Sequence, residues 1–381
     1  MRLCDHRARI ALANSHVAGV ESVSLRFNFE SLPSRVVFRA GALEDLPAET
    51  ARLGSRAFVI STPGQRRLAE RCAALLGDKA IAVYDKALMH TPGDSVRAGR
   101  AEAERLNADC CVAIGGGSTI GLAKAIAFER RFPIIAIPTT YSGSEVTPIW
   151  GHTENGIKHV TRHAHVQPRT VLYDPLLTLA LPPAISGTSG VNAIAHCVEA
   201  LYSETANPLV SLMAEEGIRA LGRSLPKVVK APSDIDARSD ALYGAWLGGY
   251  VLGAVGMALH HKLAHVLGGA FNLPHAETHT VVLPHVVAYN STAAPDAIRR
   301  IASALGAANA AQGLFDLNRA IGASVALKDF GMPETGIDRA VELATANPYY
   351  NPAPIRADAI RQLLRDAWEG RPPRTISGDA R

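Results

Sequence analysis

Short apolar runs alternate with longer stretches of helical spacing in the first half of the chain, and this alternation constrains the fold most strongly. Five runs are predicted to be strands: residues 35–38, 57–61, 80–84, 110–114 and 133–138. Helices are predicted between them, over residues 68–76, 96–106 and 119–128. Strands that alternate with helices in this way form a parallel sheet. Because the strands are apolar almost throughout, helices are expected on both faces of that sheet.

The pattern changes after Asp174 and Pro175. From about Leu181 onward the apolar spacing is helical and rich in Ala and Leu, with few strand candidates. A chain of 381 residues is also too long for one compact core. We therefore expect a loose extension over residues 1–24, an α/β dinucleotide-binding domain over 25–180, an all-helical catalytic domain over 181–370 and a loose tail over 371–381.

Residues 241–259 carry no charge and are nearly long enough to span a bilayer. They include five glycines and run directly into His260, His261 and Lys262. Small residues also let helices pack closely inside a water-soluble core, and the sequence has no second candidate span. The stretch is therefore predicted to be a buried helix, and no membrane partner is expected.

Composition argues against several other classes of protein. Apolar residues make up 48% of the chain and charged residues 19%, as in ordinary globular proteins. The net charge of +4 is scattered, so no nucleic-acid partner is expected. The five cysteines include no C-x-x-C pair, which favours a reducing compartment over a disulfide framework. Polar residues interrupt the first 22 positions, so we expect no signal peptide and a cytoplasmic protein.

Gly115, Gly116, Gly117 and Ser118 follow the predicted strand at 110–114 and precede a helix. Three glycines leave no Cβ between the backbone and a ligand, and Ser118 or Thr119 is expected to cap the helix. The first N–H groups of that helix and its dipole favour a phosphate. The glycine spacing, G-x-G-x-x-x-G, is one residue longer than the usual dinucleotide fingerprint. The turn therefore predicts a phosphate site of an unusual kind, or else a tight turn that binds nothing.

A second polar loop, residues 139–145, follows the predicted strand at 133–138. Loops at the carboxyl ends of adjacent parallel strands share one crevice, where ligands of open α/β sheets bind. Two such loops rich in small hydrogen-bonding side chains are better explained by a bound nucleotide than by chance. The contacts predicted from this second loop are Thr139, Thr140, Ser142 and Ser144.

The helical half holds seven of the 14 histidines, and six of these seven lie between positions 260 and 285. Asn192 and His196 are four residues apart, as are His261 and His265, so each pair shares one helix face. A polar stripe in otherwise apolar helices predicts side chains that point into a cleft. Metal binding is one explanation, because imidazole suits zinc or iron, and hydrogen-bonded structural histidines are the other. Further histidines follow nearby, at positions 260, 275, 279 and 285.

The chain resembles the iron-containing alcohol dehydrogenase family over about residues 30–365. The matching motifs are residues 115–118 and 138–147, Asn192 with His196, and His261, His265 and His275. Five shorter stretches resemble the maleylacetate reductase branch of that family: residues 32–38, 89–92, 148–151, 259–263 and 273–279. The resemblance implies NADH or NADPH as the cofactor, a deep cleft between the two domains and a homodimer.

The resemblance also implies a degenerate metal site. Dehydrogenases of the family hold a divalent metal with one aspartate and three histidines, and the matching positions here are Asn192, His196, His261 and His275. A neutral amide is a much poorer partner for a hard cation than a carboxylate is. We therefore expect no bound metal.

A second departure concerns the adenine ribose. Many family members hold the ribose hydroxyls with an aspartate after the second strand, and Thr62 stands at the matching place here. The charge that would repel a 2′-phosphate is absent, and Arg66 and Arg67 lie close by in sequence. We therefore expect NADPH to be accepted as well as NADH.

The reaction implied by the resemblance is the reduction of maleylacetate to 3-oxoadipate during the breakdown of aromatic compounds. This substrate has two carboxylates and a carbon–carbon double bond conjugated to a ketone. The site then needs donors at the developing oxyanion, a proton source and cations for the carboxylates. We expect His196, His261, His265 and His275 to act as donors and anion binders, with His265 as the proton donor by family position. The carboxylate-binding candidates are Lys262, Lys158 and Arg162.

Three other functions stay open. The first is a metal-dependent alcohol dehydrogenase of the same fold that acts on a small alcohol or aldehyde. The second is a lyase-like relative of the dehydroquinate synthase type, which also relies on metal ligands. Asn192 disfavours both. The third is a nucleotide-binding protein without catalytic activity, which the density of polar residues at the predicted site disfavours.

Overall fold

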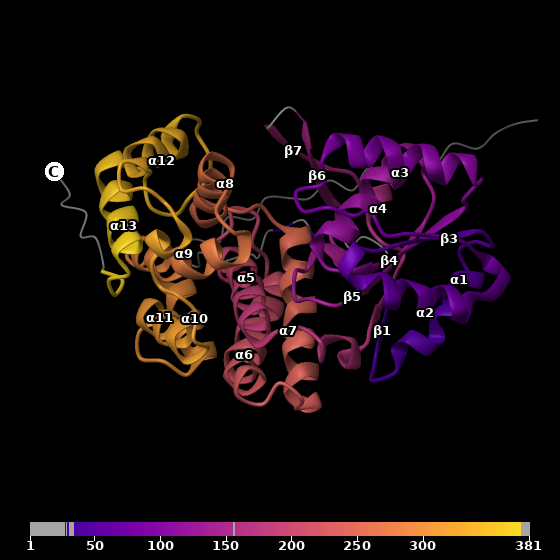
Figure 1. The fold of residues 1–381 in the computed structure, drawn as a ribbon. Helices are drawn as coiled ribbons and strands as arrows, with labels where there is room; N and C mark the ends of the chain where they lie inside the picture. The colour runs from indigo at the N-terminus through magenta and orange to yellow at the C-terminus, as the bar shows by residue number, and fades with distance from the viewer. Residues whose placement is uncertain (1–26, 28, 30–33, 155–156, 375–381) are drawn as a thin grey trace, which may run out of the picture.

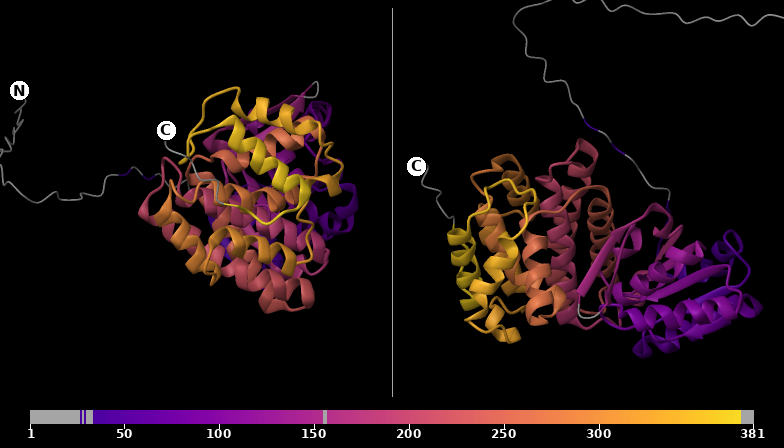
Figure 2. Two further views of the ribbon diagram at one scale, coloured as in Figure 1. Left: turned by 90° about the vertical axis from the view of Figure 1, so that its left-hand side faces the viewer. Right: turned by 90° about the horizontal axis from the view of Figure 1, so that it is seen from above.

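The structure is a computed structural model that describes residues 27, 29, 34–154 and 157–374. The chain forms an α/β half followed by a helical half, and the two halves lie side by side (Figures 1 and 2). The predicted extension over residues 1–24 lies outside the described residues. The connection between the halves runs from the short 3-10 helix Pro175–Thr178 to the first long helix, α5 (Pro183–Leu201).

The α/β half is built on a six-stranded sheet whose neighbouring strands are all parallel. The strand order is β1-β8-β5-β4-β2-β3. The bounds are β1 Arg35–Phe38, β2 Ala57–Ile60, β3 Ala80–Tyr84, β4 Cys110–Gly115, β5 Ile134–Pro138 and β8 Thr170–Tyr173. The first five of these agree with the predicted strands to within one residue at each end. They are recognisable because every residue of the central strands β2, β4 and β5 is buried.

Helices cover both faces of the sheet, as predicted (Figure 1). Alternate residues of one strand serve the two faces: Val112 of β4 packs with Cys72 of α2, whereas Ala113 packs with Ile120 of α4. One face is therefore covered by α1 (Leu46–Ala51) and α2 (Arg66–Leu76), and the other by α3 (Gly93–Arg105) and α4 (Gly117–Arg130).

Three strands were not predicted. An antiparallel hairpin of β6 (Ile149–Glu154) and β7 (Ile157–Arg162) stands apart from the main sheet, and β8 is the second sheet strand from the β1 edge. The hairpin carries histidines and charged residues in place of an apolar run, so its pairing had no signal in the sequence. Strand β8 has four residues, like β1 and β2, and its apolar run was overlooked in the sequence analysis.

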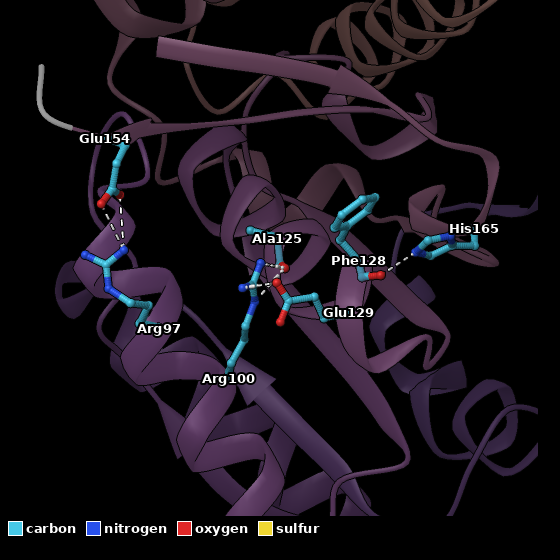
Figure 3. A network of polar contacts seen from close by, with 7 residues as sticks. All are labelled: Arg97, Arg100, Ala125, Phe128, Glu129, Glu154 and His165. Atoms are coloured by element: carbon cyan, nitrogen blue, oxygen red, sulfur yellow. Dashed lines mark hydrogen bonds and ion pairs between the residues drawn. The ribbon is translucent and has the colours of Figure 1, made fainter. Parts of the chain in front are cut away.

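Polar contacts fasten the hairpin to the helices beside it (Figure 3). Arg97 of α3 donates to Oε1 of Glu154 on β6 at 3.0 Å. A ring nitrogen of His165, which follows the hairpin, lies 2.8 Å from the carbonyl oxygen of Phe128 on α4. Arg100 links α3 to α4 by donating to the carbonyl oxygen of Ala125 at 3.0 Å. The hairpin is thereby held against α3 and α4.

The helical half contains two cores. The helices that pack around the first are α5, α6 (Pro208–Lys230), α7 (Ile235–Ala254), α10 (Pro295–Leu305) and α11 (Ala310–Ala320). Those around the second are α8 (Leu259–Phe271), α9 (His275–Tyr289), α12 (Gly336–Thr345) and α13 (Ala357–Glu369). The helices α5 and α8, which carry His196 and His261, thus belong to different cores.

The stretch at 241–259 is not one helix, and that prediction was wrong. Helix α7 ends at Ala254 and α8 begins at Leu259, with a bend of 96° between them. Among the described residues, no single helix has the length and apolar character needed to cross a membrane. The break has a physical function, because it exposes the N-terminus of α8 to a side chain from α5.

The start of the predicted loose tail is held in place, which corrects that prediction for residues 371–374. The backbone N–H of Arg371 donates to the carbonyl oxygen of Asp366 at 2.9 Å. Nη2 of Arg374 lies 2.7 Å from the buried carboxylate of Asp366. The rest of the predicted tail, residues 375–381, lies outside the described residues.

Candidate active site

The glycine turn joins β4 to α4 and leaves little room for a side chain at its first two positions. Gly115 has φ 153°, and a Cβ there would lie 2.4 Å from Oγ1 of Thr119 and 2.6 Å from Oε1 of Gln65. A Cβ on Gly116 would lie 3.0 Å from Oγ1 of Thr140. The backbone therefore runs directly beneath polar side chains, so these positions require glycine.

Helix α4 begins earlier than predicted, which changes the role of two residues. Its first residue is Gly117 and its N-cap is Gly116, with no side-chain cap. Ser118 and Thr119 thus lie inside the first turn, and the expectation that one of them caps the helix was wrong. Oγ1 of Thr119 is buried without a hydrogen-bond partner among the described residues. A helix N-terminus without a side-chain cap suits an anion such as a diphosphate.

The second loop lies beside the glycine turn because β4 and β5 are neighbours in register. Gly115 pairs with Pro138, and the N–H of Thr139 donates to the carbonyl oxygen of Gly115 at 3.1 Å. Gln65, from the turn after β2, donates to Oγ1 of Thr139 at 2.6 Å. A Cβ on Gly117 would lie 3.8 Å from Oγ of Ser142. The predicted residues of the two loops therefore surround one region. Gln65, which follows β2, reaches the same region from the carboxyl end of a third strand.

A buried lysine holds the second loop. Nζ of Lys124, on α4, donates to the carbonyl oxygens of Thr147 at 2.7 Å and Ile149 at 2.9 Å, and also to that of Ser144. Burial lowers the pKa of Lys124 to about 7 and raises the pKa of Glu145 beside it. Glu145 also accepts a hydrogen bond from the hydroxyl of Tyr173 on β8, at 2.9 Å. The sequence analysis did not identify Lys124, although a lysine in an apolar helix next to the glycine turn was a signal.

The second loop also touches the helical half. Gly143 has φ 77°, and a Cβ there would lie 2.7 Å from Cα of Gly249 on α7 and 3.6 Å from Nδ1 of His196 on α5. The N–H of Tyr141 donates to Oγ of Ser189, also on α5, at 3.1 Å. The loop predicted to bind the cofactor is therefore bonded to α5 and lies beside the first of the predicted site histidines.

The histidines of the helical half form one cluster with a buried centre. His196, His260, His261 and His279 are buried, whereas His265 and His275 are exposed. The ring of His261 lies 5.2 Å from that of His196 and 5.0 Å from that of His279. Burial lowers the pKa of His196, and the charges of His261 and His275 lower it further. Burial lowers the pKa of His260 and His279 in the same way, so these three rings are neutral near pH 7.

The predicted proton donor lies at the edge of this cluster. The His265 ring is exposed and lies 6.4 Å from that of His261. His275 is also exposed, and its ring is 4.4 Å from that of the buried His279. The i, i+4 spacing of His261 and His265 therefore places one ring inside the cluster and the other where solvent protons reach it.

Glu199 is the main site residue that the sequence analysis missed. It is fully buried on α5, three residues after His196. Its Oε2 accepts from Nδ1 of His261 at 2.7 Å, and its Oε1 accepts from the N–H of His260 at 2.7 Å. The signal was a single carboxylate in an otherwise apolar helix beside a candidate histidine.

The positions that match the family's metal ligands lack the carboxylate that a hard cation prefers. Oδ1 of Asn192, Nδ1 of His196 and Nε2 of His261 are buried without hydrogen-bond partners among the described residues. This set offers an amide oxygen and two imidazoles but no carboxylate. Within the described ranges, no three side chains of His, Cys, Asp or Glu are placed to hold a metal ion.

Of the three predicted carboxylate-binding cations, Lys262 and Arg162 have described side chains, and each contacts another part of the protein. Lys262 lies 5.7 Å above the ring of Tyr349, which packs against the second helical core. Arg162 donates to the carbonyl oxygen of Gly253 at the end of α7, at 2.7 Å, and its side chain is exposed. Lys158 lies on β7, and its side chain is outside the described part of the structure.

Near the predicted ribose site, two acidic residues pair with Arg66. Thr62 is the N-cap of the 3-10 helix Pro63–Gln65. The Arg66 guanidinium makes ion pairs with Glu70 at 2.8 Å and with Asp85 at 3.0 Å. Arg67 is exposed.

The chain matches two models that together cover most of its length: iron-containing alcohol dehydrogenase over residues 33–175, and the C-terminal part of the Fe-containing alcohol dehydrogenase family over residues 186–368. It is 58% identical to a maleylacetate reductase of Burkholderia cepacia, over 90% of this chain and 98% of that one. A maleylacetate reductase of Sphingobium indicum is 54% identical, over 92% and 100%. The crystal structure of a maleylacetate reductase from Agrobacterium tumefaciens superposes with a TM-score of 0.89 at 51% identity, over 92% and 100%.

Proposed function

Because the chain belongs to the iron-containing alcohol dehydrogenase family and is an oxidoreductase, we propose that it reduces the carbon–carbon double bond of maleylacetate, giving 3-oxoadipate. The electron donor is NADH or NADPH. This reaction carries over from relatives that are 50% to 58% identical to the chain. The substrate is a small dicarboxylate that arises in the breakdown of aromatic compounds.

The close approach of Gly143 to His196 is the observation that carries this proposal. A Cβ added to Gly143 would lie 3.6 Å from Nδ1 of His196, so a loop suited to a dinucleotide lies beside the cluster of imidazoles. A substrate held beside the cofactor then lies against hydrogen-bonding groups rather than against apolar side chains. Proximity of this kind is the main requirement for a direct transfer between two bound molecules.

The histidine cluster suits the chemistry of an enone. When bound, the dihydronicotinamide supplies a hydride to the β-carbon, and the electron pair of the double bond moves onto the ketone oxygen as an enolate. Imidazole N–H groups stabilise the enolate by hydrogen bonding, and a proton is then added to the α-carbon. The exposed His265 exchanges protons with solvent, which fits the role of proton source, and His275 lies at the same exposed edge.

No step in this reaction passes through a metal. The developing oxyanion is stabilised by hydrogen-bond donors, and the amide of Asn192 replaces the carboxylate that a hard cation prefers. We therefore propose a metal-independent reaction for this member of an iron-containing family.

The ion pairs of Arg66 favour NADH over NADPH, although both are substrates in this proposal. Glu70 and Asp85 neutralise the guanidinium and add negative charge beside Thr62. A 2′-phosphate placed there meets repulsion that the ribose hydroxyls of NADH do not. We also propose a homodimer in the cytoplasm, and the four cysteines that the structure describes as buried free thiols support a reducing compartment.

One assay tests the proposal. Oxidation of NADH and of NADPH at 340 nm is followed with maleylacetate as the substrate, before and after extended dialysis against EDTA. The expected result is turnover with both cofactors, a higher kcat/KM with NADH, and no loss after dialysis. Loss of activity that Fe²⁺ or Zn²⁺ restores, together with turnover of a small aldehyde, would instead identify a metal-dependent alcohol dehydrogenase.

A further inference from the structure

Glu199 connects two features of the site that come from different helices. Its carboxylate is fully buried on α5 and reaches the start of α8, which follows the sharp bend after α7. Oε2 accepts from the N–H of Ala258 at 2.9 Å, and Oε1 accepts from the N–H of His260 at 2.7 Å. Ala258 is the N-cap residue of α8 and has no side chain that can cap. Glu199 therefore replaces the missing cap from outside the helix.

The same carboxylate determines how the His261 ring is turned. Nδ1 of His261 lies 2.7 Å from Oε2 of Glu199. A carboxylate held by backbone N–H groups can only accept, so Nδ1 of His261 is the donor in this contact. The neutral ring then has no proton on Nε2. That nitrogen is buried without a hydrogen-bond partner among the described residues, and its ring faces those of His196 and His279.

We propose that Glu199 is a positioning residue for the reaction, because it fixes both the orientation and the Nδ1–H tautomer of His261. The inference rests on the proposed function for the identity of the reaction. The tautomer of His261 is a property of the free enzyme and does not depend on that reaction. It changes one expectation from the sequence. In its neutral form, His261 presents a lone pair to the site and accepts a hydrogen bond there, rather than donating one.

A helix cap without any effect on His261 is the alternative that the experiment must exclude. Replacing Glu199 by glutamine keeps the size of the side chain but turns one acceptor into an NH₂ group. That group must face either a backbone N–H of α8 or Nδ1 of His261, so the carboxylate arrangement is lost. If Glu199 only caps α8, the loss affects turnover whether or not His261 is present. If it acts through His261, removing His261 first abolishes the effect.

The kinetic test compares wild type, Glu199→Gln, His261→Phe and the double variant. The expected result is a fall in kcat with maleylacetate of about 10- to 100-fold for Glu199→Gln, the range typical of residues that orient a functional histidine. The KM for NADH changes less than about twofold, and Glu199→Gln has no further effect on the residual turnover of His261→Phe. A matched control is Asp174→Asn, which removes a buried carboxylate that accepts from the N–H groups of Gly41 and Leu43 and contacts no histidine of the cluster through these bonds. It is expected to lower the Tm without changing kcat.

A spectroscopic measurement decides the proposal without relying on any variant of Glu199. In wild-type enzyme labelled with ¹⁵N-histidine, the two signals that disappear in His261→Phe belong to His261. The expected shifts at pH 8 are those of a protonated Nδ1 and a bare Nε2. A protonated Nε2 would overturn the proposal, as would an unchanged kcat in Glu199→Gln or an equal loss in both backgrounds. If wild type fails to reduce maleylacetate, the proposed function is wrong, and the tautomer alone then decides the role of Glu199.

Discussion

Nε2 of His260 lies 2.8 Å from Nδ1 of His279, and both rings are fully buried. One nitrogen must donate and the other must accept, so this contact holds only while at least one of the two rings is neutral. Burial lowers the pKa of both histidines well below the usual value, and neighbouring histidines lower it further. The core of the site is therefore built from uncharged imidazoles, which makes the folded protein sensitive to acid.

The first prediction concerns acid stability. Below about pH 6.5 the unfolded chain takes up protons that the folded chain excludes from its buried histidines, so stability falls as the pH falls. For His285, burial lowers the pKa to about 4. Replacing His285 by Asn should reduce the loss of unfolding free energy between pH 6.5 and pH 5 by about 2 kcal/mol. Urea unfolding at the two pH values measures this, with the exposed His159→Asn as a control that leaves the pH dependence unchanged.

The second prediction concerns the contact between the halves. Gly143→Ala places a Cβ 2.7 Å from Cα of Gly249, at a backbone φ of 77° that disfavours side chains. We expect a destabilisation of about 1–3 kcal/mol and a higher KM for NADH, because the second loop must move away from α7. Gly269→Ala is the control, since nothing lies within 4 Å of its Cβ position in α8. An unchanged KM in Gly143→Ala would show that the close approach has no influence on cofactor binding.

The third prediction concerns the metal. Asn192→Asp adds a carboxylate beside Nδ1 of His196 and Nε2 of His261, which have no hydrogen-bond partner in the described part of the chain. We expect the variant to retain Zn²⁺ or Fe²⁺ after dialysis in near-stoichiometric amounts and to lose turnover of maleylacetate. Elemental analysis of dialysed wild type and variant measures the difference. Equal metal content in the two proteins would contradict the role given to the amide.

The fourth prediction concerns cofactor preference. Replacing Asp85 by Asn removes one of the two carboxylates paired with Arg66. Arg66 then keeps only Glu70 as a partner and attracts a 2′-phosphate more strongly, so the ratio of kcat/KM for NADPH to that for NADH should rise about 2- to 5-fold, as expected for an exposed ion pair. The exposed Asp78→Asn, at the far end of β3, is the control. A constant ratio in Asp85→Asn would remove Arg66 from the ribose site.

The fifth prediction concerns Lys124. Replacing it by methionine leaves the carbonyl oxygens of Thr147 and Ile149 and the carboxylate of Glu145 without their cation. We expect a loss of about 3–5 kcal/mol in stability and a raised KM for NADH, because the second loop is no longer held. Lys230→Met, at the exposed end of α6, should change neither quantity. A Lys124→Met variant with normal stability and KM would contradict this role for Lys124.

Much of the α/β half could be predicted because its signals are local. A buried strand such as Cys110–Gly115 is a continuous apolar run, and the glycines after it follow from backbone space alone. The hairpin at 149–162 and the break between α7 and α8 had no such signal. Both depend on residues that are distant in sequence. Arg97 donates to Glu154 of the hairpin, and the carbonyl oxygen of Phe128 bonds to His165 just after it. Glu199 caps α8.

The sequence by itself determined which chemical groups this protein has: a glycine turn for a phosphate, an amide at position 192 where a carboxylate was expected, and seven histidines in the helical half. Helical periodicity could place His261 and His265 on one face, but it could not tell which ring is buried. Only the tertiary structure decided that His261 meets Glu199 and that His265 stays in solvent. The physical reason is that burial and hydrogen bonding depend on what other helices bring to the same place, and α5 and α8 come together only when the chain is folded.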